Sequence, residues 1–196
     1  QFDAAPGGGL DQVNLGLFTI GEAGNPVGGS GLVITESSGN LNFTVLRIHA
    51  QGDYGLRSSR SAYQANAHLI TIADGQGTIT ASKGAAVSLT NLDINAPNLA
   101  LTSTNSPNYG LHLVNVYGTL STTNTSAISG STTAAVLVDK GSANLTYNGT
   151  ITQINGRTVE VTNRTGGSLS FTGAVNGGGT GVLLSNNNSS TNITFK

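Results

Sequence analysis

The chain of 196 residues contains no cysteine, no methionine and no tryptophan. The absence of cysteine excludes disulfide bonds and every mechanism that needs a thiol. Because both sulfur-containing residues are missing, the chain offers few groups that oxidation can damage. This composition suits a long-lived extracellular protein.

Charged residues are also scarce. They make up 9% of the chain, against roughly 25% in an ordinary domain, and the net charge is −1. Such a balance gives no reason to expect nucleic acid or an anionic membrane as a partner. No apolar run approaches the roughly 20 residues of a transmembrane helix, and His49 and His68 have no third ligand nearby that would complete a metal site. We therefore expect no nucleic acid, no transmembrane segment, no metal and no cofactor.

What the chain does contain is a repeat. Val136, Val159 and Val182 stand at a constant interval, and each begins an apolar-x-apolar sequence. The same pattern occurs in five copies: Val87/Leu89, Leu111/Leu113, Val136/Val138, Val159/Val161 and Val182/Leu184. Alternation of period two indicates strands with one buried face, and a fixed period in the twenties indicates a repeat architecture.

The repeat predicts an all-β fold. A unit of roughly 23–25 residues holds three short strands, which stack on the equivalent strands of the next unit as parallel sheets. We therefore predict a parallel β-helix, or β-solenoid, of about 7–8 coils. We expect residues 31–196 to form this β-helix, most regularly over 86–196 and with no cap at the C-terminal end, and residues 1–30 to form a leader and an N-terminal capping coil.

Asparagine recurs four positions after the first apolar residue of the repeat. The positions are Asn91, Asn115, Asn163 and Asn186, with Lys140 in the remaining copy. Asparagine tolerates the left-handed conformation and bonds to nearby backbone, so it suits a sharp turn that every coil repeats. The pattern predicts a structural asparagine ladder.

Residues 47–68 depart most from the repeat and supply the candidate binding residues, since several arginines gather there beside two tyrosines. The candidates are Arg47, His49, Asp53, Tyr54, Arg57, Arg60 and Tyr63. A guanidinium recognises carboxylates as a planar fork and a tyrosine ring offers a stacking face, so the segment is a hypothetical site for sugars or carboxylates. The alternative interpretation is an ordinary solvated surface with an Arg–Asp pair.

Two further functions stay open at this point. The first is a polysaccharide lyase or glycoside hydrolase, for which Asp53 and Asp74, separated by close to one period and near two arginines, are the best candidate carboxylates. The second is ice binding by stacked Thr-x-Thr sequences, which occur at residues 78–80, 102–104 and 150–152 but are interrupted at residues 126–128. We predict no enzymatic activity, with polysaccharide cleavage as the main alternative.

The C-terminal copies carry a resemblance to known proteins. Their shared pattern is Val-x-Val-x-Asn, a glycine turn, Leu-x-Phe/Tyr-x-Gly and then Ile151 or Val175. It resembles the β-strand repeats of large secreted bacterial surface proteins, such as autotransporter passengers and filamentous haemagglutinin-like adhesins. The resemblance implies a right-handed β-helix on a bacterial cell surface with a structural or adhesive role. The implied partners are adjacent repeats of a longer parent chain and a host surface or polysaccharide.

Overall fold

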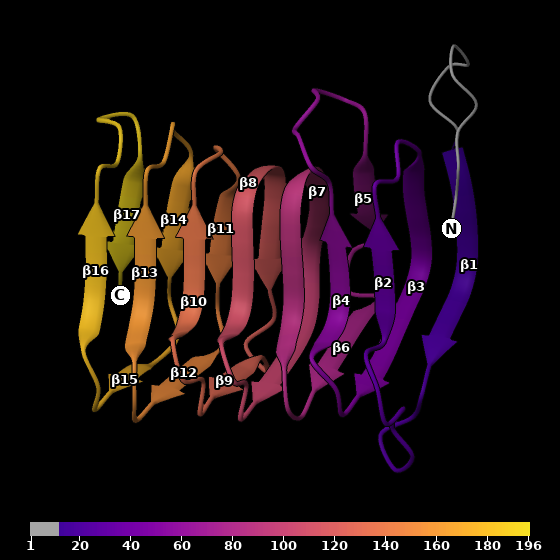
Figure 1. Cartoon of the computed structure of the whole chain (residues 1–196), viewed down its shortest axis with the longest axis horizontal. Helices are drawn as coiled ribbons and strands as arrows, with labels where there is room; N and C mark the ends of the chain where they lie inside the picture. The colour runs from indigo at the N-terminus through magenta and orange to yellow at the C-terminus, as the bar shows by residue number, and fades with distance from the viewer. Residues whose placement is uncertain (1–11) are drawn as a thin grey trace.

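The computed structural model describes residues 12–196, which form seventeen strands and no helix (Figure 1). Every pairing between these named strands is parallel. The strands stack as a solenoid of about eight coils. The prediction of an all-β parallel β-helix is confirmed.

Each complete coil contributes one strand segment to each of three faces. Face 1 contains β2 (Leu32–Thr35), β4 (Tyr54–Ser59), the first parts of β7 (Ala85–Thr104) and β8 (Tyr109–Thr122), β10 (Ala134–Asp139), β13 (Arg157–Thr162) and β16 (Gly181–Ser185). Face 2 contains the first parts of β1 (Gln12–Ile20) and β3 (Asn40–Ala50), β5 (Leu69–Ile72), the middle of β7, the second part of β8, β11 (Asn144–Tyr147), β14 (Ser168–Phe171) and β17 (Asn192–Phe195). Face 3 contains the second parts of β1 and β3, β6 (Gly77–Ala81), the end of β7, β9 (Ala127–Ser129), β12 (Thr150–Gln153) and β15 (Val175–Gly177).

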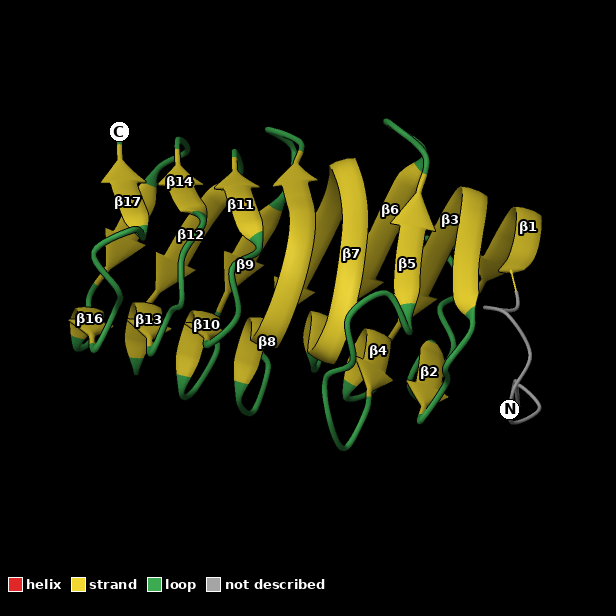
Figure 2. Ribbon diagram, turned by 90° about the horizontal axis from the view of Figure 1, so that it is seen from above, coloured by secondary structure: helices red, strands yellow, loops and turns green. Residues whose placement is uncertain are grey.

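The solenoid is right-handed. In Figure 1 the strands of face 1 lie nearest the viewer and run upward, the strands of face 2 lie behind them and run downward, and the chain advances from right to left. Figure 2, which looks from above, shows the two layers apart, with face 1 in the lower part of the picture and face 2 in the upper part. A path that rises in front, descends behind and advances to the left has a right-handed sense.

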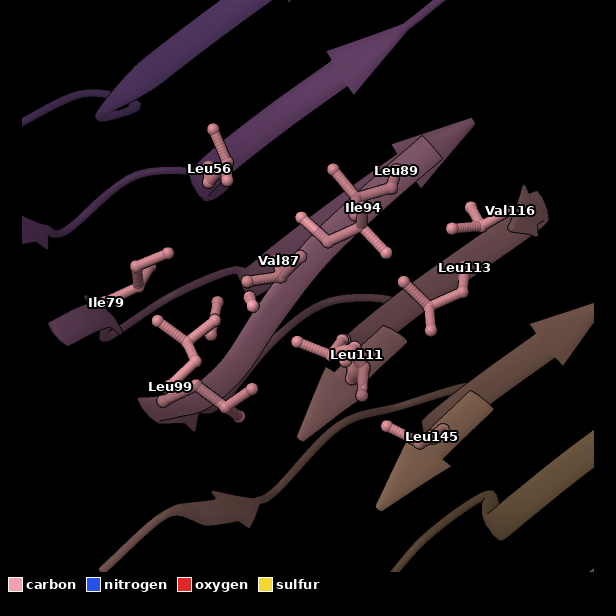
Figure 3. Packing of buried hydrophobic residues seen from close by; sticks show 14 of the residues in the cluster. Leu56, Ile79, Val87, Leu89, Ile94, Leu99, Leu111, Leu113, Val116 and Leu145 are labelled. Atoms are coloured by element: carbon pink, nitrogen blue, oxygen red, sulfur yellow. The ribbon is translucent and has the colours of Figure 1, made fainter. Parts of the chain in front are cut away.

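The core consists of rows of apolar side chains that follow the solenoid axis (Figure 3). The first inward row of face 1 contains Leu32, Leu56, Val87, Leu111, Val136, Val159 and Val182. The second row contains Ile34, Ser58, Leu89, Leu113, Val138, Val161 and Leu184. The five predicted apolar pairs therefore stack in the predicted register, and two more coils precede them.

Face 2 ends in a short aromatic stack inside the solenoid. The rings of Phe171 and Phe195 lie 5.0 Å apart and almost parallel, and the ring of Tyr147 lies 6.5 Å from that of Phe171. Tyr147 and Phe171 are fully buried, and the Tyr147 hydroxyl donates to the carbonyl of Thr150. These three aromatic residues recur at a constant interval in the sequence, so each coil places its ring over the previous one.

The turn after the face 1 strand adopts the left-handed conformation in each of the five regular coils. Asn91, Asn115, Asn163 and Asn186 have φ angles between 52° and 59°, and Lys140 has a φ of 57°. The Nδ2 of Asn115 donates to the Oδ1 of Asn91 over 2.8 Å, while the Nδ2 of Asn163 donates to Asp139 instead. The amide-to-amide bond thus joins Asn91 and Asn115, and Lys140 interrupts the series.

The start of the solenoid differs from the regular part in two respects. Residues 12–20 form a paired strand of faces 2 and 3, while residues 1–11 of the predicted leader lie outside the described residues. A loop over residues 60–68 is inserted between faces 1 and 2, so that Leu56 and Val87 stack although their separation in the chain exceeds one regular repeat.

Candidate functional site

The seven candidate residues lie at three separate places on the solenoid. Three line a groove on face 1: Asp53, Tyr54 and Arg57. Two lie on the outer side of face 3: Arg47 and His49. Two belong to the inserted loop: Arg60 and Tyr63. The structure does not gather this segment into one site, because the chain changes face at the turn before β4 and again after it.

The groove on face 1 has a volume of about 340 Å³. The lining residues are Asp53, Tyr54, Arg57, Ala85, Ser88, Thr90, Ser106, Pro107, Asn108, Tyr109 and His112. They come from the turn before β4, from β4, from the first part of β7, from the turn before β8 and from the first part of β8. These three strand segments lie side by side in Figure 1. The groove therefore crosses three successive coils and runs along the strands.

Side-chain size explains why this part of face 1 is hollow. On β7 the outward side chains are the small Ala85 and Ser88, which form the floor. On β4, Tyr54 pairs with Ala85 and Arg57 pairs with Ser88, and they form one wall. Two strand spacings, or about 9–10 Å, separate β4 from β8, which supplies the other wall.

Each wall is a stacked pair of nearby side chains from one strand. On β4 the guanidinium carbon of Arg57 lies 5.0 Å from the ring centroid of Tyr54. On β8 the rings of Tyr109 and His112 lie 4.7 Å apart at an angle of 17°. Guanidinium and imidazole groups both stack on tyrosine rings, so the two side chains of each pair stabilise each other's orientation. The walls are thus two parallel flat-sided ridges.

The glycines between the stacked residues allow this geometry. A Cβ at Gly55 would come within 2.4 Å of the Ile79 side chain, and one at Gly110 within 2.2 Å of the Ile128 side chain. No Cβ atom tolerates such contacts, so only glycine lets the backbone approach the core this closely. In both coils this glycine directly follows the tyrosine of the wall.

His112 is the titratable group at the centre of one wall. Its Nδ1 lies 3.1 Å from the Oγ of Ser88 on the groove floor. Burial lowers the pKa of His112, Asp139 opposes this shift and Arg57 adds to it. Burial also raises the pKa of Tyr109, with a smaller contribution from Glu160. The imidazole of His112 is therefore uncharged at neutral pH.

The inserted loop has a structural role in the described part of the chain. The ring of Tyr63 stacks on that of Tyr117 at 4.1 Å, and its hydroxyl donates to Asp93 over 3.0 Å. The backbone N–H of Asn66 donates to the second oxygen of Asp93. Burial, followed by the hydrogen bond and charge of Asp93, raises the pKa of Tyr63 to about 12. A cavity of about 410 Å³ lies beside this contact, but both carboxylate oxygens of Asp93 already hold the loop.

A second Ser–His pair lies inside the solenoid. The Oγ of Ser58 is 3.0 Å from the Nε2 of His68, whose Nδ1 is 2.6 Å from the carbonyl oxygen of Gly39. A carbonyl only accepts, so Nδ1 carries the proton and Nε2 accepts from Ser58. Both side chains are 1% exposed. The pair satisfies its own polar atoms within the core and offers no access to a substrate.

The carboxylates and threonines proposed for other functions are not brought together as expected. Asp53 lies at the turn before β4, between faces 3 and 1, whereas Asp74 lies at the turn between β5 and β6, where faces 2 and 3 meet. The threonine register also differs, because Thr80 pairs with Thr102 and Thr78 pairs with Ala100. The row through Thr80 and Thr102 continues to Ala127, which interrupts it.

The sequence contains a signal for the groove that the repeat analysis missed. Tyr-Gly-Leu-Arg at residues 54–57 recurs as Tyr-Gly-Leu-His at residues 109–112. The interval between the two copies is not a whole number of regular repeats, because the inserted loop lengthens one coil. Ser88, Tyr109 and His112 were consequently left out of the candidate set.

Residues 12–196 include no helix long and apolar enough to cross a membrane. In the same range, no group of three or more histidine, aspartate or glutamate side chains could hold a metal ion. Comparison with protein-family models, curated proteins and solved structures finds no match.

Proposed function

We propose that this chain is a structural and adhesive β-helix segment of a secreted bacterial surface protein, and that the groove on face 1 binds polysaccharide. The observation that carries the adhesive part is the pair of Tyr-based ridges on either side of a floor of small residues. The regular repeat does not require tyrosine at these positions, because Ala85 and Ala134 occupy the equivalent position on neighbouring coils.

The scaffold supports the structural part of the proposal. Eight coils at about 4.8 Å each give a rod roughly 38 Å long. One continuous core runs through it and includes side chains from all three faces. A solenoid of this kind transmits load along its axis and presents its faces at fixed positions, as a stalk or adhesive surface requires.

The groove lining suits a sugar better than an apolar ligand. The rings of Tyr54 and Tyr109 supply flat apolar surfaces with a polar end. Around them lie hydroxyl, amide, imidazole and guanidinium groups from Ser88, Asn108 and the two ridges. Pockets that combine aromatic faces with a few placed polar groups are typical ligand sites.

Binding is favoured over cleavage for this groove. Glycoside hydrolysis commonly uses two carboxylic acids that flank the scissile bond. The described lining contains one carboxylate, Asp53, and Asp74 lies at a different corner of the coil. Polysaccharide cleavage therefore stays a second candidate, supported only by the presence of Asp53, Arg57 and His112 along the same groove.

The proposal is tested with a panel of soluble bacterial, plant and animal polysaccharides, with binding and cleavage measured on the same samples. We expect binding without cleavage by the wild type and a roughly tenfold weaker affinity for Tyr109→Ala. Alanine is compatible with this site, because Ala134 pairs with Tyr109 on the next coil. Thr80→Ala, on the outer side of face 3, is the matched control and should bind normally.

Three results would contradict the proposal. If no polysaccharide binds, the adhesive role of the groove is wrong. If Thr80→Ala weakens binding as much as Tyr109→Ala does, the ligand lies elsewhere. If a polymer is cleaved, the enzymatic alternative replaces the adhesive one.

A further inference from the structure

Arg57 is a cation whose N–H groups have no hydrogen-bond partner among residues 12–196. Its guanidinium stacks over Tyr54, yet it forms no hydrogen bond or ion pair with any residue in the range 12–196. Arg164 and Arg157, in contrast, bond to backbone carbonyls and to Glu160 respectively. A half-buried guanidinium has five N–H donors in a planar fork, and those of Arg57 are directed to the groove and solvent.

A further donor is present across the floor from Arg57. Arg57, Ser88 and His112 pair in register on three adjacent strands, with Ser88 in the middle. Ser88 Oγ and His112 Nδ1 share one hydrogen bond of 3.1 Å. If Ser88 donates, the Nε2–H of His112 is free, and if His112 donates, the hydroxyl hydrogen of Ser88 is free. Either arrangement leaves one donor hydrogen free within the Ser88–His112 pair.

We propose that the ligand of this groove is an acidic saccharide, whose oxyanion lies over Ser88 between Arg57 and the Ser88–His112 pair. This inference rests on the proposed function and adds the ligand's charge. The sugar ring of the acidic unit lies against Tyr109. Carboxylates and sulfates share the required chemistry, since both accept paired hydrogen bonds from a guanidinium.

Three carboxylates of the described residues lie near the groove: Asp53 in its lining, and Asp139 and Glu160, whose charges act on His112 and Tyr109 of the far wall. Asp53 lies at the turn directly before β4, and it forms no ion pair with Arg57 within the described residues. No ion pair within the described residues neutralises the Arg57 guanidinium, so it is available to a ligand.

The experiment compares matched polymers that differ only in charge. Polygalacturonate is measured beside its methyl ester, and chondroitin sulfate beside chemically desulfated chondroitin, by biolayer interferometry with the whole chain. We expect the wild type to bind the carboxylate polymer, the sulfated polymer or both, and to bind the methyl ester at least tenfold more weakly than polygalacturonate where polygalacturonate is a ligand. The two pairs show which oxyanion the groove accepts.

Two arginine variants separate a specific contact from general electrostatic attraction. Arg57→Gln should weaken binding of the acidic polymer by roughly ten- to hundredfold, the range expected when a charge-assisted hydrogen bond is lost. Arg47→Gln removes the same charge from face 3 and should leave the affinity unchanged. Thermal melting of both variants confirms that the fold is retained.

The outcomes distinguish this inference from the proposed function. Equal binding of charged and neutral polymers, or an affinity that Arg57→Gln does not change, overturns the acidic ligand and leaves a neutral-glycan groove. Equal losses in Arg57→Gln and Arg47→Gln also overturn it, because they show a diffuse charge effect. Binding of no polymer overturns the groove itself and the inference with it.

Discussion

Lys140 provides a direct test of the left-handed turn that every regular coil repeats. It has a φ of 57°, although lysine has no side-chain group that stabilises this conformation. The left-handed region costs a non-glycine L-residue roughly 1–2 kcal/mol, and asparagine reduces that cost by bonding to local backbone. Lys140→Asn should therefore stabilise the protein.

The structure sets the size of this effect. The Lys140 side chain is exposed, and its backbone N–H and carbonyl already bond to Thr162 and Arg164, so the substitution disturbs no packing. A new Nδ2 at this position can donate to Asn115, as Asn115 donates to Asn91 over 2.8 Å. One net hydrogen bond adds about 0.5–1.5 kcal/mol. Together the two effects predict a gain of about 1–2 kcal/mol in the free energy of unfolding.

The measurement is urea unfolding followed by circular dichroism, with hydrogen exchange at the turn as a local reading. For a chain of this size a gain of about 1 kcal/mol raises Tm by roughly 2–4 °C. Lys83→Asn is the matched control, because Lys83 is also exposed but its φ is not positive. The reasoning is refuted if Lys140→Asn is no more stable than Lys83→Asn.

Two other predictions concern the interior. Burial lowers the pKa of His68, so below its ordinary value of 6.5 the unfolded chain binds more protons than the folded chain. The free energy of unfolding should then fall on acidification from about pH 7 to pH 5, by at most about 1.4 kcal/mol per pH unit from this group, and equal pH slopes in wild type and His68→Gln would contradict this. Phe171→Ala should cost about 3–5 kcal/mol and Phe171→Leu clearly less, as measured by urea unfolding. A loss below about 1 kcal/mol for Phe171→Ala would show that the aromatic stack is not part of the core.

The regular part of the fold could be predicted from the sequence because its side chains stack in straight rows along the solenoid axis. Each inward side chain stacks on the residue one repeat away in the sequence. A constant spacing is therefore enough to predict that Val136 and Val159 pair in register. The same constant spacing places His112 between Ser88 and Leu137, as the register has it. Spacing alone carries this information wherever each coil has the same length.

The candidate site was not readable in this way, because it depends on a coil of different length. The inserted loop 60–68 lengthens the interval between Leu56 and Val87 beyond one regular repeat. Periodic comparison therefore could not place Arg57 beside Ser88 and His112, and sequence proximity grouped Arg57 with Arg47 instead. The loop also lies at a corner of the solenoid. A difference of one residue in its length changes the face on which the following side chains lie.

The groove and the repeat thus require different residues at the first position of the face 1 strands. The regular solenoid needs only a small outward residue at the start of a face 1 strand, as Ala85 and Ala134 show. Tyr54 and Tyr109 depart from this on alternate coils, and each is followed by a glycine that lets the backbone sink against the core. Two large residues on either side of a small one make a hollow that neither could make alone. The proposed binding site therefore depends on where the repeat is broken, and Arg57, which has no hydrogen-bond partner within the described coils, lies at such a break.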